Sequence, residues 1–167
     1  MLLGSNLNKR HFNFVISLLV LIAFHVIAIN SRYNVSFVVS ESIVPVVIIW
    51  EELSDYRFIN GDYIVFEWEH EGDALGVKKG DLLTKRVFCM PKQNLVFRNN
   101  QFFCDLKPSH LVQSKSRKNK PLSPFKWNGD VPEGSFFVEG DNPLSYDSKY
   151  FGFIDLKNIK GIVRFYL

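Results

Sequence analysis

The longest apolar run of the chain lies near its N-terminus, at positions 12–29, and only Asn13, Ser17 and His25 interrupt it. As a helix, this run would extend about 27 Å at about 1.5 Å per residue, close to the roughly 30 Å of a bilayer's hydrocarbon core. The pattern therefore predicts one transmembrane anchor at 12–30. A cleaved signal peptide is the alternative, but the run is long for one and offers no small-x-small cleavage site.

The charges beside this run predict its orientation. Lys9 and Arg10 precede it, whereas Arg32 alone follows closely. Because basic residues are retained on the cytoplasmic side of a membrane, residues 1–11 are expected in the cytoplasm and residues 31–167 on the opposite side of the bilayer.

Beyond position 30, short runs rich in Val, Ile and Phe alternate with turn-forming residues, a pattern typical of strands. The 16 Phe among 167 residues favour the same structure. Residues 31–167 are therefore predicted to form one mainly β domain. Strands are expected at 35–39, 46–49, 63–68 and 161–166, a turn followed by a strand over 131–139, and two more strands in 95–103 around an Asn-Asn turn.

The composition excludes several classes of function. A formal net charge of +3 is too small to indicate nucleic-acid binding, and the chain has no Gly-rich phosphate loop and no zinc-ligand spacing. No cofactor or metal is expected. The acidic stretch 67–71, which contains His70, is interpreted as solvated residues at a strand end.

Two further features concern the body. Cys89 and Cys104 flank the predicted hairpin 95–103, so a disulfide is geometrically reasonable and would imply an oxidising compartment; two buried free thiols are the alternative. No acidic residue lies between Asp105 and Asp130, while basic residues gather there. This basic stretch, about 106–130, is predicted to be a solvated loop or insertion, with contact to anionic lipid head groups or a partner protein as the alternative.

Four short motifs follow one another along the body: Ser40–Pro45, Asn60–Phe66, Thr84–Val87 and Gly140–Asn142, the last continued by the segment 145–152. In this order they resemble the type I signal peptidases, a family of Ser-Lys proteases, from about Val39 to the C-terminus. The resemblance implies an antiparallel β catalytic domain of the signal-peptidase type, carried by one N-terminal transmembrane helix.

The resemblance makes Ser42 the nucleophile and Lys85 its general base. A lysine has a reference pKa near 10.4, and a useful base at neutral pH needs about 7 to 8, a difference of roughly 4 kcal/mol. Apolar neighbours that exclude water, helped by the adjacent Arg86 charge, are expected to supply it. A Ser-His-Asp triad is a poor alternative because no signature surrounds any histidine.

Other residues receive supporting roles by the same resemblance. The backbone N–H of Ser42 and the hydroxyl of Ser40 would bind the oxyanion, and Ser145 would hydrogen-bond the lysine amine. A structural ion pair is implied between Asp147 and Lys149, and the corner at Asp141 and Asn142 would support the dyad.

The chain departs from the usual family pattern at Ile43, Val46, Lys92-Gln93 and Lys149. These departures concern the subfamily: a short chain, one anchor, Cys89 and Cys104 around a hairpin, and the segment 142–148 in the last motif resemble the conjugative-transfer peptidases of the TraF type. That subfamily implies a pilin precursor or another exported protein as substrate, the lipid bilayer and type IV secretion or conjugation components as partners, and a bacterial inner-membrane location with the catalytic domain in the periplasm. A general signal peptidase, or a non-catalytic assembly factor that keeps the fold, are the alternatives.

Overall fold

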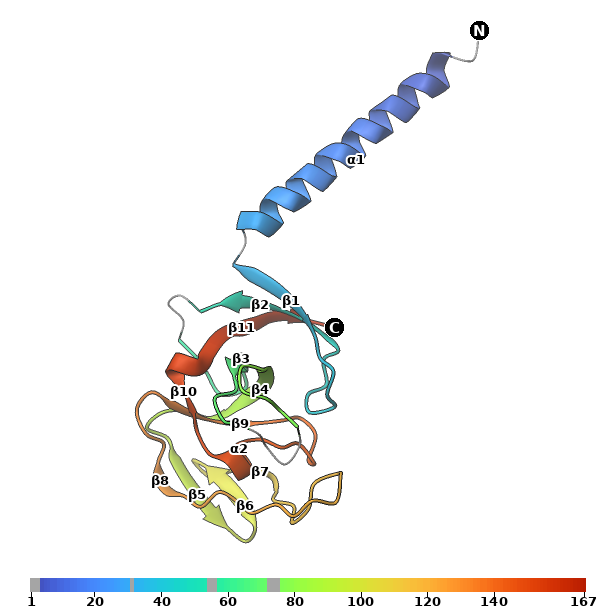
Figure 1. Ribbon diagram of the computed structural model, residues 1–167. Helices are drawn as coiled ribbons and strands as arrows, with labels where there is room; N and C mark the ends of the chain where they lie inside the picture. Colours follow the sequence, from blue (N-terminus) through green and yellow to red (C-terminus); the bar gives the residue numbers. More distant parts are fainter. Residues whose placement is uncertain (1–3, 31, 54–56, 72–75) are drawn as a thin grey trace. The chain divides into compact units, whose positions relative to one another are not determined.

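The computed structural model describes residues 4–30, 32–53, 57–71 and 76–167 (Figure 1). The chain divides into two units, Met1–Tyr33 and Asn34–Leu167. Positions 1–3 of the predicted cytoplasmic segment and position 31, the predicted start of the β domain, lie outside the described residues.

The first unit is one helix, α1 (Gly4–Asn30). Its described apolar side chains run from Phe12 to Val26 and are exposed. Within the described residues, no helix reaches the length and apolar character of a membrane span. The predicted helix is present, but the structure does not support a transmembrane anchor at 12–30.

The second unit is built of antiparallel strands in two sheets, which confirms the prediction of a mainly β fold. The seven-stranded sheet has the order β1 (Tyr33–Phe37), β2 (Val47–Glu52), β11 (Ile159–Tyr166), β3 (Tyr63–Glu67), β4 (Leu82–Cys89), β9 (Ser135–Glu139) and β10 (Ile154–Asp155). The four-stranded sheet has the order β7 (Lys107–Leu111), β6 (Gln101–Cys104), β5 (Asn94–Arg98) and β8 (Asn128–Asp130). Two short helical segments, α2 (Ser148–Phe151) and the 3₁₀ turn η1 (Leu156–Asn158), follow β9.

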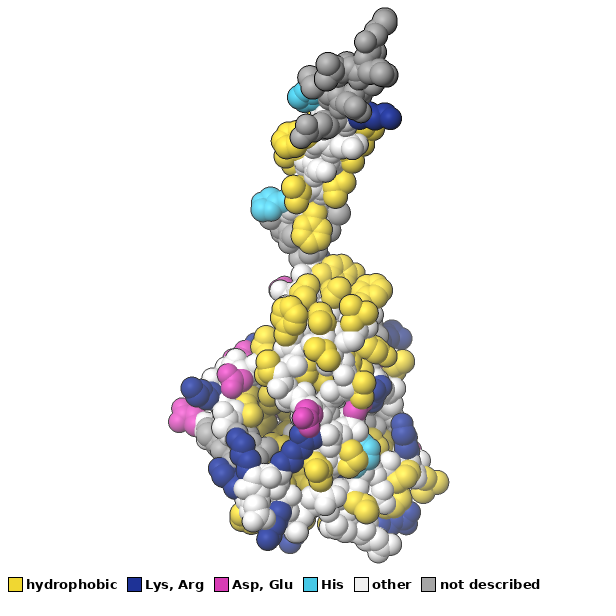
Figure 2. Space-filling view, turned by 90° about the vertical axis from the view of Figure 1, so that its right-hand side faces the viewer, with side chains coloured by type: hydrophobic (Ala, Val, Ile, Leu, Met, Phe, Trp, Pro, Cys, Tyr) yellow, Lys and Arg dark blue, Asp and Glu magenta, His cyan; other side chains and the backbone are white. Residues whose placement is uncertain are grey.

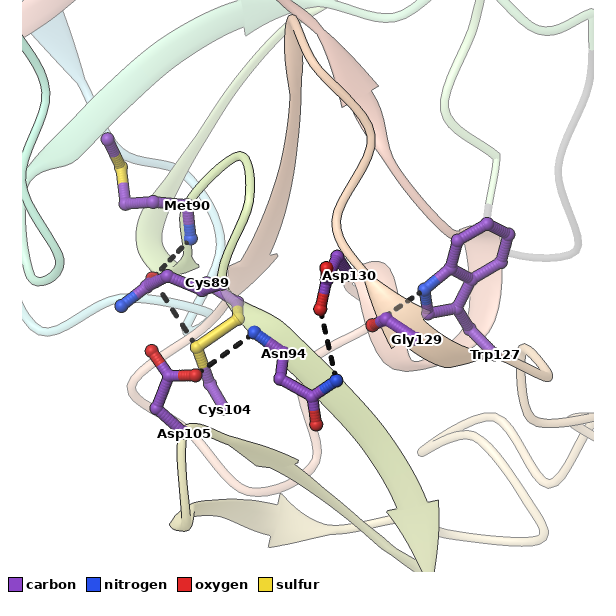
Figure 3. Close-up of a disulfide and its surroundings, with 9 residues drawn as sticks. Cys89, Met90, Asn94, Cys104, Asp105, Trp127, Gly129 and Asp130 are labelled. Atoms are coloured by element: carbon purple, nitrogen blue, oxygen red, sulfur yellow. Dashed lines mark hydrogen bonds between the residues drawn. A yellow bond between two sulfur atoms is a disulfide. The ribbon is translucent and has the colours of Figure 1, made fainter.

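The predicted hairpin is formed by β5 and β6. Asn99 and Asn100 both have positive φ, 50° and 61°, as a two-residue hairpin turn requires, and Asn tolerates that conformation well. Cys89 at the end of β4 and Cys104 at the end of β6 form a disulfide with a Cα–Cα distance of 5.6 Å (Figure 3). The covalent link therefore joins the two sheets.

The basic stretch 106–130 is not one long loop. Its ends are β7, which pairs with β6, and β8, which pairs with β5. Pro108 within β7 and the polar sequence of β8 gave no strand signal, because proline and polar turn residues are typical of sequences outside strands. Only the segment 112–127 lies between the two strands.

Strand β9 lies between two hydrophobic clusters and leads directly to the corner at Gly140. Phe136 and Val138 belong to a cluster with Ile64 and Val87, whereas Phe137 packs in a second cluster that contains the disulfide. Because successive side chains of a strand point to opposite faces, β9 is buried on both sides. Its C-terminal end is thereby fixed against both cores.

Candidate active site

Lys85 lies on the face of β4 that is directed into the hydrophobic core. On β4 it shares a face with Leu83 and Val87, which both pack in the core, and it is paired across the sheet with the buried Ile64. Only 4% of Lys85 is exposed. Burial, the largest cause, lowers the pKa of Lys85 to about 8, and it does so although the carboxylates of Asp147 and Asp141 act in the opposite direction.

The charge that helps to lower the pKa of Lys85 is that of Lys149, rather than that of Arg86 as the sequence suggested. The Arg86 guanidinium is engaged by Asp141, with Nη2 at 2.9 Å and Nε at 3.0 Å from Oδ1. Its positive charge is therefore compensated locally. The Lys85 amine itself takes part in no hydrogen bond or ion pair within the described part of the chain.

Ser42 lies directly against the Gly140 corner. Its carbonyl oxygen accepts a hydrogen bond of 3.2 Å from the backbone N–H of Asn142. A Cβ atom at Gly140 would lie 2.6 Å from this carbonyl oxygen and still closer to the Ser145 hydroxyl. Only glycine fits here, so Ser42, Gly140 and Ser145 are packed without a gap.

Asp141 fastens the loop that follows Ser42 to the seven-stranded sheet. Its carboxylate accepts hydrogen bonds from the backbone N–H of Val44 at 2.9 Å, from the Tyr63 hydroxyl and from Arg86. Burial works to raise the pKa of Asp141, but these hydrogen bonds outweigh it and hold the pKa below its usual value. The loop is thus held by β3 and β4 together, and Tyr63 is a contributor that the sequence motifs did not single out.

The ion pair implied by the resemblance is present and buried. Lys149 Nζ lies 2.7 Å from Asp147 Oδ2, and neither side chain is exposed to solvent. The same carboxylate oxygen accepts a 3.0 Å hydrogen bond from the Gly140 backbone N–H. The pair therefore connects α2 to the corner that holds Ser42.

A second carboxylate, which sequence reasoning missed, extends this pair. Glu139 Oε1 lies 3.2 Å from Lys149 Nζ and accepts a 2.6 Å hydrogen bond from the backbone N–H of His110 on β7. The only sequence signal is an acidic residue at the end of an otherwise apolar strand. Glu139 links the four-stranded sheet to the buried cation.

Two predicted contacts are not made among the described residues. The Ser145 hydroxyl is buried, with 2% of the residue exposed, and has no hydrogen-bond partner among the described residues, so it does not bond the Lys85 amine. No hydrogen bond joins Ser42 to Lys85 in the described structure. The Ser40 hydroxyl and the Ser42 N–H are also without a partner there, which leaves both available to a substrate oxygen.

Two hollows adjoin the segment Ser40–Ser42. One, of about 550 Å³, is lined by 38–41, 43–46 and 141–143. The other, of about 520 Å³, is lined by 39–42, the segment 116–118 with its two basic residues, and the segment 144–146. A polypeptide would find room on both sides of this segment. In the part of the chain that is described, no group of three or more His, Cys, Asp or Glu residues could hold a metal ion.

Residues 9–167 match the protein family that is described as "Signal peptidase, peptidase S26". Proteins named inactive signal peptidase IA from several Staphylococcus aureus strains are 32% identical over 120 residues, which covers 67% of this chain and 69% of the relative. Signal peptidase I V of Bacillus subtilis is 32% identical over 111 residues, 59% of this chain and 66% of that protein. A crystal structure of a signal peptidase I from Enterococcus faecalis V583 covers 66% of this chain and 100% of its own, with 24% identity and a TM-score of 0.44.

Proposed function

Because the chain belongs to the peptidase S26 family of signal peptidases, we propose that it is a serine endopeptidase that processes exported precursor proteins. The observation that carries the proposal is the state of Lys85. Burial lowers its pKa to about 8, close to the value that a general base needs at neutral pH. A lysine with only a structural role gains nothing from such burial.

The reaction would begin with neutral Lys85, which accepts the proton of the Ser42 hydroxyl as its oxygen attacks the scissile carbonyl. At pH 7 about one tenth of a group with a pKa of about 8 is deprotonated. The Ser42 N–H and the Ser40 hydroxyl stabilise the oxyanion, and one such donor is worth about 3 to 4 kcal/mol of transition-state stabilisation. When the tetrahedral intermediate collapses, the scissile C–N bond breaks, the protonated Lys85 gives its proton to the leaving amine, and an acyl-enzyme remains. Water hydrolyses this acyl-enzyme to a linear product, or an amine of the substrate takes the acyl group and the product is cyclic.

The buried charges of Asp147 and Lys149 have opposite effects on the pKa of Lys85. Asp147 raises the pKa of Lys85, and Lys149 lowers it. Because Lys149 and Asp147 form an ion pair, their effects on Lys85 largely offset, and burial determines the outcome. Asp141 and Asn142 act on the other partner by holding the Ser42 loop in place.

The proposed substrate is a pilin precursor or another exported protein of a conjugative or type IV secretion system. The features that support it are the cysteine pair around the β5–β6 hairpin and the segment 142–148 in the last motif. A disulfide also agrees with a compartment outside the cytoplasm, such as the periplasm, because cytosolic thiols are kept reduced.

A non-catalytic assembly factor is the second candidate, and the name inactive signal peptidase IA of the Staphylococcus aureus relatives favours it. A scaffold has no chemical need for Ser42 or for a buried lysine. Burying a lysine costs stability, so Lys85 is hard to explain in a chain that only binds.

The test is precursor processing by the full-length protein. Purified precursors of a conjugative pilin and of a secreted protein are incubated with wild type, Ser42→Ala and Lys85→Met, and the products are weighed by mass spectrometry. Wild type should trim at least one precursor, and both variants should leave it intact. The product mass also separates hydrolysis from cyclisation, which differ by one water. Equal processing by a variant would disprove the dyad, and intact precursors with all three proteins would favour the scaffold.

A further inference from the structure

The basic segment 114–122 is folded into a defined hairpin-like loop. Lys115 and Pro121 form an isolated β-bridge, and the backbone N–H of Ser116 donates to the carbonyl of Lys120 at 2.8 Å. Outside this bridge, the N–H of Leu122 donates to Ser114 at 2.9 Å. These hydrogen bonds give the loop a fixed shape that a solvated linker would lack.

Both ends of this loop are attached to the segment that supports the dyad. The backbone N–H of Gln113 donates to the Tyr150 hydroxyl at 2.9 Å, and the N–H of Phe125 donates to the carbonyl of Lys149 at 2.8 Å. The loop therefore takes its position from the buried Lys149 itself. In Figure 1 it lies on the right-hand side of the body, the side that faces the viewer in Figure 2.

The tip of the loop lines the hollow of about 520 Å³ beside Ser42: Arg117 and Lys118 share this hollow with Ser42 and Ser145. Arg117 Nη1 lies 2.5 Å from a carboxylate oxygen of Glu41, the residue next to Ser42. No ion pair engages Lys118 within the described residues. Two cations thus meet one anion, and the hollow keeps a net positive charge next to the reacting hydroxyl.

The ion pair between Arg117 and Glu41 is open to exchange. The two side chains are 40% and 81% exposed, and an exposed pair contributes little net stability because water solvates both partners. A carboxylate from another chain can therefore replace that of Glu41 at little cost, and the planar guanidinium suits two-pronged binding of a carboxylate.

We propose that this hollow is a subsite that binds an acidic residue of the substrate close to the bond that is cut, with Arg117 and Lys118 as its specificity residues. The inference rests on the proposed peptidase function and adds a substrate class to it: precursors with Asp or Glu near the cleavage site. A peptide is favoured over an anionic lipid head group because the same hollow contains Ser42 and Ser145, where the peptide must lie to react.

The experiment uses the full-length protein and peptides that span the bond cut in a processed precursor. At each of three positions on either side of that bond, Gln is compared with Glu and with Lys, and kcat/KM is measured at low salt. Wild type should prefer Glu over Gln about fivefold at one position, the upper range for an exposed ion pair. This ratio should fall as salt is added.

Variants separate the subsite from a general effect of charge. In the double variant Arg117→Gln/Lys118→Gln the Glu-to-Gln ratio should fall to about one, and Arg117→Glu should turn the preference towards Lys. Lys79→Gln, which removes a charge that is also exposed but lies outside the hollow, should keep the wild-type ratio.

Several results would overturn the inference. Equal cleavage of Glu and Gln peptides by wild type would remove the subsite and leave the peptidase function intact, whereas no cleavage of any peptide would remove both. An unchanged ratio in the double variant would assign the preference to other residues. An effect of the double variant that appears only with phosphatidylglycerol vesicles, equally for all peptides, would show that the loop binds lipid.

Discussion

Replacing Lys85 with Met should stabilise the protein at neutral pH while it abolishes the proposed activity. Lys85 is 4% exposed, and its pKa falls from 10.5 to about 8 on folding because burial disfavours the charged amine. At about 1.36 kcal/mol per pH unit, this difference amounts to about 3 kcal/mol of lost stability when the lysine is protonated. Methionine has a similar length and no charge, so it fills the same space without this cost.

The stability difference depends on pH in a defined direction. Below pH 8 the lysine is protonated in both the folded and the unfolded chain, and the wild type bears the full cost. Between about pH 8 and 10.5 the unfolded state binds a proton that the folded state does not, so wild-type stability rises with pH relative to the variant. The advantage of Lys85→Met should therefore be about 3 kcal/mol at pH 7 and should vanish towards pH 10.5.

Urea unfolding of the full-length protein, followed by tryptophan fluorescence from pH 6.5 to 10, measures this difference. Lys79→Met is the matched control, because Lys79 is exposed and should change stability by no more than about 0.5 kcal/mol. If Lys85→Met is no more stable than wild type at pH 7, or if its advantage does not shrink as pH rises, Lys85 is not the desolvated amine described above.

Three further variants test the buried ion pair, the Gly140 corner and the disulfide. Lys149→Met leaves the Asp147 carboxylate buried without its cation, so urea unfolding should show a loss of about 3 to 5 kcal/mol; a loss below about 1 kcal/mol would speak against a buried ion pair. Gly140→Ala places a methyl group 2.6 Å from the Ser42 carbonyl oxygen. Because this displaces Ser42, precursor cleavage should fall about a hundredfold. Near-normal cleavage would show that the backbone at Gly140 can move to accommodate the methyl group. The double variant Cys89→Ser/Cys104→Ser opens a link with a sequence separation of 15 and should lower the free energy of unfolding by about 3 kcal/mol, a change that a reductant should reproduce in wild type and not in the variant.

The sequence predicted those features of the fold and the site that depend on residues close together in the chain. The Asn99-Asn100 turn follows from the tolerance of asparagine for positive φ, and the hairpin in turn brings Cys104 to the sheet that carries Cys89. Apolar residues on both sides of Lys85 likewise indicated its burial, which the structure shows.

Features that depend on pairing between distant segments were not predictable in this way. β7 contains Pro108 and is held by β6, so its strand character comes from its neighbour rather than from its own residues. The role of Glu139 is visible only once β7 places His110 beside it. Asp141, which compensates the charge of Arg86, lies 55 residues further along the chain. Because this contact is not visible in the sequence, Arg86 was predicted to lower the pKa of its neighbour Lys85, whereas the cation that does so is Lys149.

The pH dependence of precursor cleavage tests the central claim most directly. If neutral Lys85 activates Ser42, kcat/KM should rise about tenfold per pH unit below about 8 and level off above it, and Ser42→Ala should show no cleavage at any pH. A rate that is flat from pH 6 to 10, or cleavage by Ser42→Ala, would contradict the Ser-Lys mechanism.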